Sequence, residues 1–168
     1  MADITTNTAA PIERKYLAHF IDASFGGTEN YVRLGIDLEE FNEELNPDIE
    51  QKKNILGENR VLHNGYEVSS DVEPFYAYEG DPLWSKLQDI ANNRKTGTDC
   101  VTKMVTVLLK TDGTAEWAYR ENVYVVPTSL GGDTSGIQIP FTVYNTGDRK
   151  SVTMTVTNTT TGKKYTFA

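Results

Sequence analysis

VTKMVTVLLKTDGTAEWAYRENVYVV, residues 101–126, decides the fold class of this 168-residue chain. Apolar and polar side chains alternate over 101–109, the pattern of a strand that buries one face. Asp112-Gly113 supplies a favoured hairpin turn, and a second strand pattern follows over about 115–126. The stretch therefore predicts two long antiparallel strands joined by a tight turn.

Further strands are expected on both sides of this hairpin. They fall over about 15–21, 31–36 and 65–78 before it, and over 137–143, 152–156 and 165–167 after it. Pro140 cannot donate to a strand ladder, so its strand is expected at a sheet edge or with a bulge at that residue.

One helix is predicted over about 82–94. Asp81 can cap its first turn, Pro82 suits the first helical position, and Leu83, Leu87 and Ile90 form one apolar stripe. The predicted fold is mainly β: an antiparallel β-sandwich or half-barrel with one flanking α-helix.

Composition argues against several functional classes. With 16 basic and 24 acidic residues the net charge is -8, which disfavours a surface that grips nucleic-acid phosphates. The single cysteine excludes an intrachain disulfide, and two histidines leave little for a zinc site or a catalytic triad. No apolar run approaches the length of a membrane span, and the first residues lack the features of a signal peptide. The chain is therefore expected to be neither an enzyme nor a holder of metals or cofactors.

The acidic charge is concentrated. Residues 37–50 carry seven carboxylates and no basic residue, whereas residues 128–168 have a net charge of +2. Such a segment is either a solvated acidic face or one side of a self-complementary contact between copies. Asn46-Pro47 interrupts a helical spacing, so the sequence predicts a strand running into a long acidic loop over about 42–60. The polar stretch 1–11 is expected to be a flexible arm.

Three stretches resemble major tail proteins, the tail tube proteins of tailed bacteriophages, and especially those of phages infecting Gram-positive hosts. They are EEFNEELNPD (39–48) with KKNILG (52–57); PFYAY (74–78) with DPLWSKLQDI (81–90); and SLGGD (129–133) with IPF (139–141) and NTGDR (145–149). The resemblance spans about residues 12–157, and it rests on the order and context of these motifs.

The resemblance implies a virion protein, assembled in the host cytoplasm, that forms homo-hexameric rings stacked into a tube. It divides the chain into an arm over 1–14 and a single tail-tube domain over 15–168, with the arm and the 42–60 loop reaching the adjacent ring. It implies tape measure, terminator and baseplate or distal tail proteins as partners, and genomic DNA passing through the lumen without specific binding. The candidate assembly residues are Ile12, Glu13, Arg14, Glu43, Glu44, Asn46, Pro47, Lys52, Lys53, Asp133 and Arg149.

Two alternatives accompany this hypothesis. One is another tail ring, a terminator or baseplate protein, which would form a single ring and stop. The other is a β-sandwich module that binds carbohydrate or protein, for which Trp84, Trp117 and the nine tyrosines could supply an aromatic platform. If the assembly hypothesis holds, reversing Glu43 and Glu44 to lysine is expected to block polymerisation and to leave the subunit folded.

Overall fold

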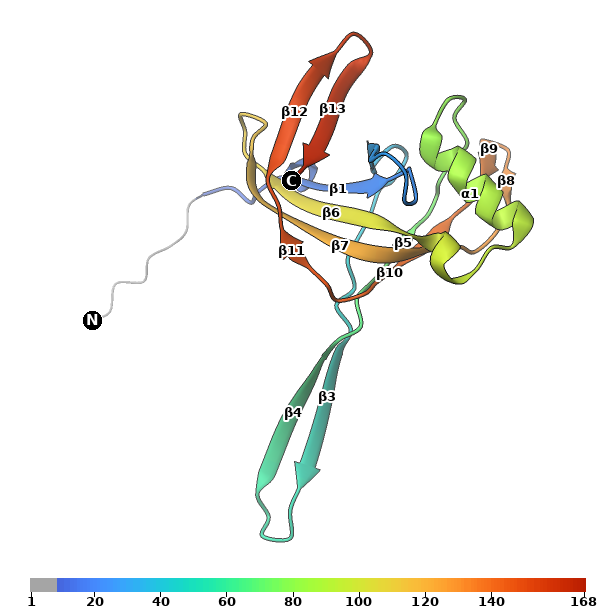
Figure 1. Ribbon diagram of the computed structural model, residues 1–168. Helices are drawn as coiled ribbons and strands as arrows, with labels where there is room; N and C mark the ends of the chain where they lie inside the picture. The colour runs from blue at the N-terminus through green and yellow to red at the C-terminus, as the bar shows by residue number, and fades with distance from the viewer. Residues whose placement is uncertain (1–8) are drawn as a thin grey trace.

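The computed structural model describes residues 9–168, so the first eight residues of the predicted arm lie outside the described part. Its centre is a seven-stranded antiparallel sheet in which the predicted β6–β7 hairpin lies in the middle (Figure 1). The spatial order is β2 (Tyr31–Arg33), β1 (Leu17–Asp22), β6 (Val101–Leu109), β7 (Ala115–Pro127), β10 (Phe141–Asn145) and β5 (Ser69–Val72), with β11 (Lys150–Ser151) also paired to β7.

The alternation of the central strands divides the core between the two faces of the sheet. On one face Met104 and Val123 pack with the apolar stripe of helix α1 (Pro82–Asn93) in one cluster of buried side chains. On the other face Val105 and Val107 belong to a second cluster, which includes Phe167 near the C-terminus. The sheet is therefore covered by the helix on one side and by the end of the chain on the other.

Helix α1 follows the sequence prediction closely. The Asp81 carboxylate accepts a hydrogen bond from the Leu83 amide at 2.9 Å, and Pro82 is the first helical residue. The helix ends at Asn93, and the next residue, Arg94, has a left-handed backbone (φ 49°) that turns the chain. At 12 residues it is short, and no helix within residues 9–168 is long and apolar enough to cross a membrane.

The C-terminal ribbon, β12 (Met154–Thr159) with β13 (Gly162–Phe167), rises from the sheet as a two-stranded hairpin (Figure 1). Its base is anchored because the Tyr165 and Phe167 rings lie 4.7 and 5.3 Å from the ring of Phe20. Beyond the base, most of its residues are exposed.

The prediction of a long loop over 42–60 is wrong, because two strands and a short turn occupy most of this segment. β3 (Pro47–Lys53) pairs antiparallel with β4 (Asn59–Tyr66), and only residues 54–58 form the turn between them. Pro47 is the first residue of its strand, a position where the missing amide costs no ladder hydrogen bond. All residues of β3 are exposed, so no buried face imposed the apolar alternation that marks a strand in sequence.

The prediction of one continuous strand over 137–143 is also wrong, because the chain forms two separate strands there. The chain breaks there into β9 (Gly136–Gln138), which pairs with β8 (Gly131–Asp133), and β10, which lies between β7 and β5 and not at an edge. The Pro140 carbonyl accepts the Thr128 amide at 2.9 Å beside the end of β7. The remaining elements are the short 3-10 helices η1 (Arg14–Tyr16) and η2 (Gly97–Cys100).

Candidate assembly surfaces

The projecting ribbon, β3–β4 (residues 47–66), is exposed along nearly its whole length. Its two strands pair with each other and with no other strand in residues 9–168. It extends from the sheet on the side opposite the C-terminal ribbon (Figure 1). A two-stranded ribbon with nothing packed on it is marginally stable in water, so this element calls for a partner surface.

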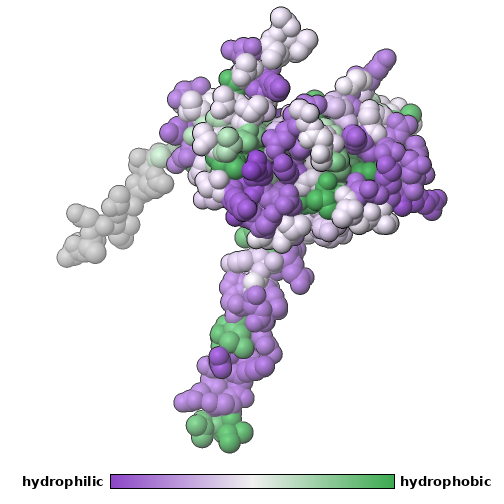
Figure 2. Space-filling model, viewed as in Figure 1, coloured by the Kyte–Doolittle hydropathy of each residue, from purple (hydrophilic) through white to green (hydrophobic). Residues whose placement is uncertain are grey.

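The tip of the projecting ribbon is apolar and held in shape by one side chain. Ile55 and Leu56 are 103% and 78% exposed. The space-filling view shows hydrophobic surface at the tip of the ribbon and a second hydrophobic patch part-way along an otherwise hydrophilic stem (Figure 2). The Asn54 side-chain oxygen accepts the amides of Leu56 and Glu58 at 3.0 and 2.9 Å, and its NH2 group donates to Glu58 at 2.6 Å. These bonds fix the turn, so the two aliphatic side chains are presented in one arrangement.

The root of the projecting ribbon is bound to the edge strand β5. The Glu44 amide donates to the Ser69 carbonyl at 2.8 Å, and the Ser69 amide donates back at 3.0 Å. Asn46 has a left-handed backbone (φ 43°), and its side chain donates to the Glu67 carbonyl at 2.9 Å and to the Ser69 hydroxyl at 3.3 Å. Glu44, Asn46 and Pro47, predicted as assembly residues, therefore lie where the ribbon leaves the body.

Glu43, also predicted as an assembly residue, lies inside the subunit. Its carboxylate is 3.3 Å from His19 Nδ1, accepts a hydrogen bond from the Thr106 hydroxyl, and is 3.4 Å from Arg149 Nη1. Glu43 and Arg149 are both predicted to contact a neighbouring subunit. In the structure they contact each other within one subunit. The pair joins the segment before the projecting ribbon to the segment after β10.

The environment of Glu43 has a definite electrostatic consequence. Burial opposes ionisation of the carboxyl, but hydrogen bonds from His19 and Thr106, with the charges of His19 and Arg149, outweigh it and hold the Glu43 pKa below its ordinary 4.5. The ring of Phe41 meets His19 edge-on at 4.5 Å. The carboxylate is therefore a structural anchor for residues 41–43.

The described end of the predicted arm is attached at the same place. Arg14 donates to the Phe41 carbonyl at 2.9 Å and to the Leu17 carbonyl at 2.5 Å. Glu13 forms an exposed ion pair with Lys15 at 2.9 Å, and Ile12 is 73% exposed. Of the three arm candidates, Arg14 makes contacts within the subunit and Ile12 presents a free apolar surface.

The remaining candidates lie far apart. Lys52 pairs with Glu50 at 3.0 Å on the projecting ribbon, and Lys53 is exposed beside the tip. Asp133 is the last residue of β8, where its carboxylate accepts hydrogen bonds from the Ser135 amide at 2.7 Å and from the Tyr76 hydroxyl at 3.2 Å. No single cluster therefore unites the predicted residues.

Two surfaces were missed by sequence reasoning. The first is a tyrosine pair: Tyr124 of β7 lies opposite Tyr144 of β10 in register, and the two are 39% and 49% exposed. Val126, 40% exposed, follows on the same face. The alternation over 115–126 indicates that one set of side chains faces outward from the strand. It does not indicate that the part of the sheet around Tyr124 and Tyr144 is left uncovered.

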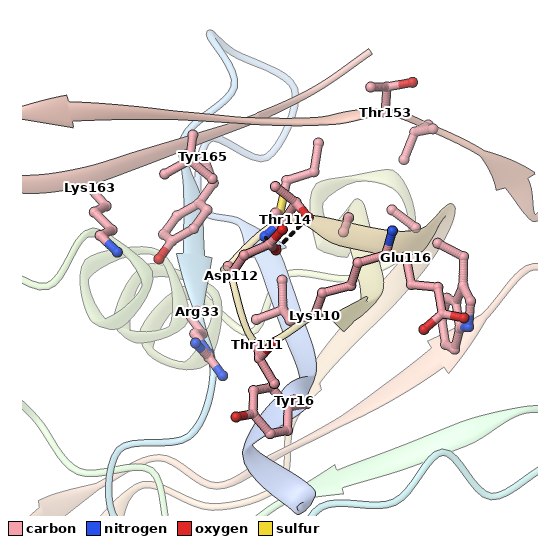
Figure 3. A pocket seen from close by; sticks show the side chains of 18 of the residues that line it. Tyr16, Arg33, Lys110, Thr111, Asp112, Thr114, Glu116, Thr153, Lys163 and Tyr165 are labelled. Atoms are coloured by element: carbon pink, nitrogen blue, oxygen red, sulfur yellow. Dashed lines mark hydrogen bonds between the residues drawn. The ribbon is translucent and has the colours of Figure 1, made fainter. Parts of the chain in front are cut away.

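The second is a cleft of about 880 Å³ beneath the C-terminal ribbon (Figure 3). It lies between the β12–β13 ribbon, from its base to Asn158 and Lys163 near its outer turn, and the β6–β7 turn, where the Thr114 hydroxyl donates to Asp112 at 2.6 Å. Its apolar lining includes Trp117, Val152, Met154, Val156 and Tyr165. Its charged lining consists of Lys15, Arg33, Lys110 and Lys163 against Asp112 and Glu116.

No protein-family model and no curated protein sequence matches the chain. Solved structures match it in fold. A chain from the PVC sheath–tube complex of an extracellular contractile injection system, in the extended state, has a TM-score of 0.53 at 15% identity; the match covers 86% of this chain and 95% of that one. A chain from the PVC sheath/tube terminator has a TM-score of 0.55 at 11% identity, with 86% and 98% covered.

A third match is the anti-feeding prophage cap, described as a tube terminating cap. Its TM-score is 0.55 at 14% identity, and the match covers 91% of this chain and 99% of that chain. At these identities the likeness is one of fold. It confirms a mainly antiparallel β fold with one flanking helix, of the kind found in the structures of phage-like injection assemblies.

Proposed function

We propose that the protein is a structural, non-catalytic subunit of the tail of a phage or phage-like injection particle, in which copies form rings that stack into a tube. The observation that carries this proposal is the projecting ribbon, which ends in the exposed Ile55–Leu56 pair and packs on no other strand of the described chain. On a fold shared with chains of tube and terminator structures, such an element is suited to reach a neighbouring copy.

The sequence resemblance adds finer points to the proposal. Six copies close each ring, in the virion of a phage that infects a Gram-positive host, with tape measure, terminator and distal tail proteins as partners. Ring closure would also cover the open edges of the sheet at β2 and β5, which are a liability in a free subunit. The net charge of -8 suits a conduit in which DNA slides without being held.

A second candidate is a ring that ends a tube. The matches to the PVC terminator and to the anti-feeding prophage cap, each with a TM-score of 0.55, favour it as much as the sheath–tube match favours a tube subunit. Such a protein would form one ring and would not propagate. A third candidate is a module that binds carbohydrate or protein, for which the exposed Tyr124–Tyr144 pair would supply an aromatic surface.

Electron microscopy of the purified full chain, with light scattering across a concentration series, tests the three candidates. Tubes or stacked rings of uniform width support the tube subunit. Single rings that do not lengthen as concentration rises support the terminator. A monomer at every concentration that is retained on a glycan matrix would replace both with the binding module.

A further inference from the structure

Building on the proposed tail role, we infer that the projecting ribbon of one copy docks lengthwise against the C-terminal ribbon of the next copy, with its tip in the cleft beneath that ribbon. The occupant of the cleft is thus the Ile55–Leu56 turn of a second copy. Position, length and apolar surface support this pairing, and charge supports it at the root of the projecting ribbon.

The two ribbons leave the body on opposite sides (Figure 1). If one copy is translated along that direction onto another, the projecting ribbon of the first runs beside the C-terminal ribbon of the second, pointing the opposite way. β3 has seven residues and β12 has six. At about 3.3 Å per residue they span about 23 and 20 Å, so one ribbon matches the other from base to tip.

This antiparallel arrangement places the apolar tip of one ribbon at the apolar base of the other. Ile55 and Leu56 lie at the outer end of the projecting ribbon and contact nothing that would exclude water from them. Met154, Val156 and Tyr165 line the cleft in the half of the C-terminal ribbon nearer its base, and Val156 is 38% exposed. Docking would remove apolar surface from water on both copies, the main favourable contribution to association.

The same arrangement pairs opposite charges at the other end. Around the root of the projecting ribbon, Glu44, Asp48 and Glu67 are all exposed. Residues 149–168 contain four basic residues and no acidic one, and Lys163 and Lys164 lie next to the outer turn of the C-terminal ribbon. The acidic root of one copy would therefore face the basic tip of the next, which fixes both direction and register.

Disulfide trapping tests the contact, because Cys100 is the only cysteine and is buried. The double variant Leu56→Cys with Thr153→Cys places one thiol on the tip and one in the cleft. Under mild oxidation it is expected to give a ladder of covalent oligomers that collapses on reduction. The matched control, Leu56→Cys with Ser129→Cys, places the second thiol in the groove beside the end of α1 and is expected to stay unlinked.

A charge exchange tests the opposite end of the ribbons. Glu67→Lys and Lys164→Glu alone are each expected to raise the concentration needed for assembly by about threefold to tenfold at low salt. The double variant is expected to return within about twofold of the unmodified chain, because the pair is restored with its signs exchanged. Two additive defects would contradict the pairing.

The outcomes separate this inference from the proposed function. If tubes form and the Ser129 variant cross-links in place of the Thr153 variant, the ribbon pairing is overturned and the tail role stands. If the unmodified chain remains monomeric at all concentrations, both are overturned. Tubes together with the Thr153 ladder and the charge rescue establish the contact.

Discussion

The carboxylate of Glu43 lies 3.3 Å from Nδ1 of His19, and their side chains are only 13% and 5% exposed. This contact ties the segment that leads into the projecting ribbon to β1 of the sheet. The segment from which the ribbon leaves the body is therefore held by a partly buried polar contact, and not by the chain connection alone.

Replacing Glu43 by glutamine is expected to lower the free energy of unfolding at pH 7 by about 2 kcal/mol, because a carboxylate that serves His19, Thr106 and Arg149 is lost. The depressed Glu43 pKa means that its stabilising contribution is present above pH 4.5 and is lost as the pH falls through the lower, folded-state pKa. Urea denaturation between pH 3 and 7 is expected to show a shallower acid limb for Glu43→Gln than for the unmodified chain.

Reversal of the two neighbouring glutamates separates folding from assembly. Sequence reasoning expected lysine at Glu43 and Glu44 to act alike, but only Glu43 is in the internal contact. Glu43→Lys should leave a cation beside Arg149 and lower the melting temperature by several degrees. Glu44→Lys should melt normally, since its backbone bonds to Ser69 remain, and should weaken only assembly. Equal melting temperatures for the two variants would contradict this assignment.

Ile55→Ser combined with Leu56→Ser should abolish assembly without changing the fold. Both side chains are fully or largely exposed and make no contribution to the core, so the melting temperature is expected to stay within about 1 °C. Light scattering should find only small species at concentrations where the unmodified chain assembles. Ile36→Ser, at another aliphatic side chain that is 71% exposed, serves as the control and should assemble normally.

Asn46 should govern the orientation of the projecting ribbon. Asn46→Gly accommodates the left-handed backbone but loses the side-chain bonds to Glu67 and Ser69, whereas Asn46→Ala loses the bonds and adds backbone strain. Both variants should show faster amide exchange over 44–48 and weaker assembly, with the alanine variant more affected. A glycine variant that assembles as well as the unmodified chain would assign the effect to the backbone alone.

Gly132→Ala is expected to disrupt the β8–β9 turn. A Cβ atom at this position would lie 2.1 Å from the Gly136 carbonyl oxygen, with φ at 152°, so the two strands could not keep their register. We expect the Asp133–Tyr76 contact to be lost and residues 131–138 to become susceptible to limited proteolysis. Gly131→Ala is the matched control, because a Cβ atom there meets nothing within 4 Å.

The buried half of the fold was predictable from the sequence, and the exposed half was not. The β6–β7 hairpin and helix α1 can be recognised in the sequence because burial of one face imposes a period on the apolar side chains. β3 has no buried face, so its sequence carries no such period and predicts a loop instead. A strand that buries no face within its own subunit therefore cannot be recognised from hydrophobic periodicity.

The sequence motifs point to candidate segments but do not separate the roles of neighbouring residues within them. The motifs around 39–57 and 129–149 predict assembly segments, yet the carboxylate run makes Glu43 and Glu44 equivalent. Their different roles depend on His19 and Thr106, which lie 24 and 63 residues away from Glu43 along the chain. Contacts of that kind are decided by sheet register, which one sequence does not reveal.

The placement of the two ribbons on opposite sides of the body has a consequence for any linear array of this chain. One terminus of the array would expose uncovered Ile55–Leu56 tips, and the other would expose empty clefts beside basic hairpins. The two termini would be chemically unlike, so elongation would proceed at different rates at each. Proteins that start or stop the array would need unrelated surfaces, one a receptor for an aliphatic plug and the other the plug itself.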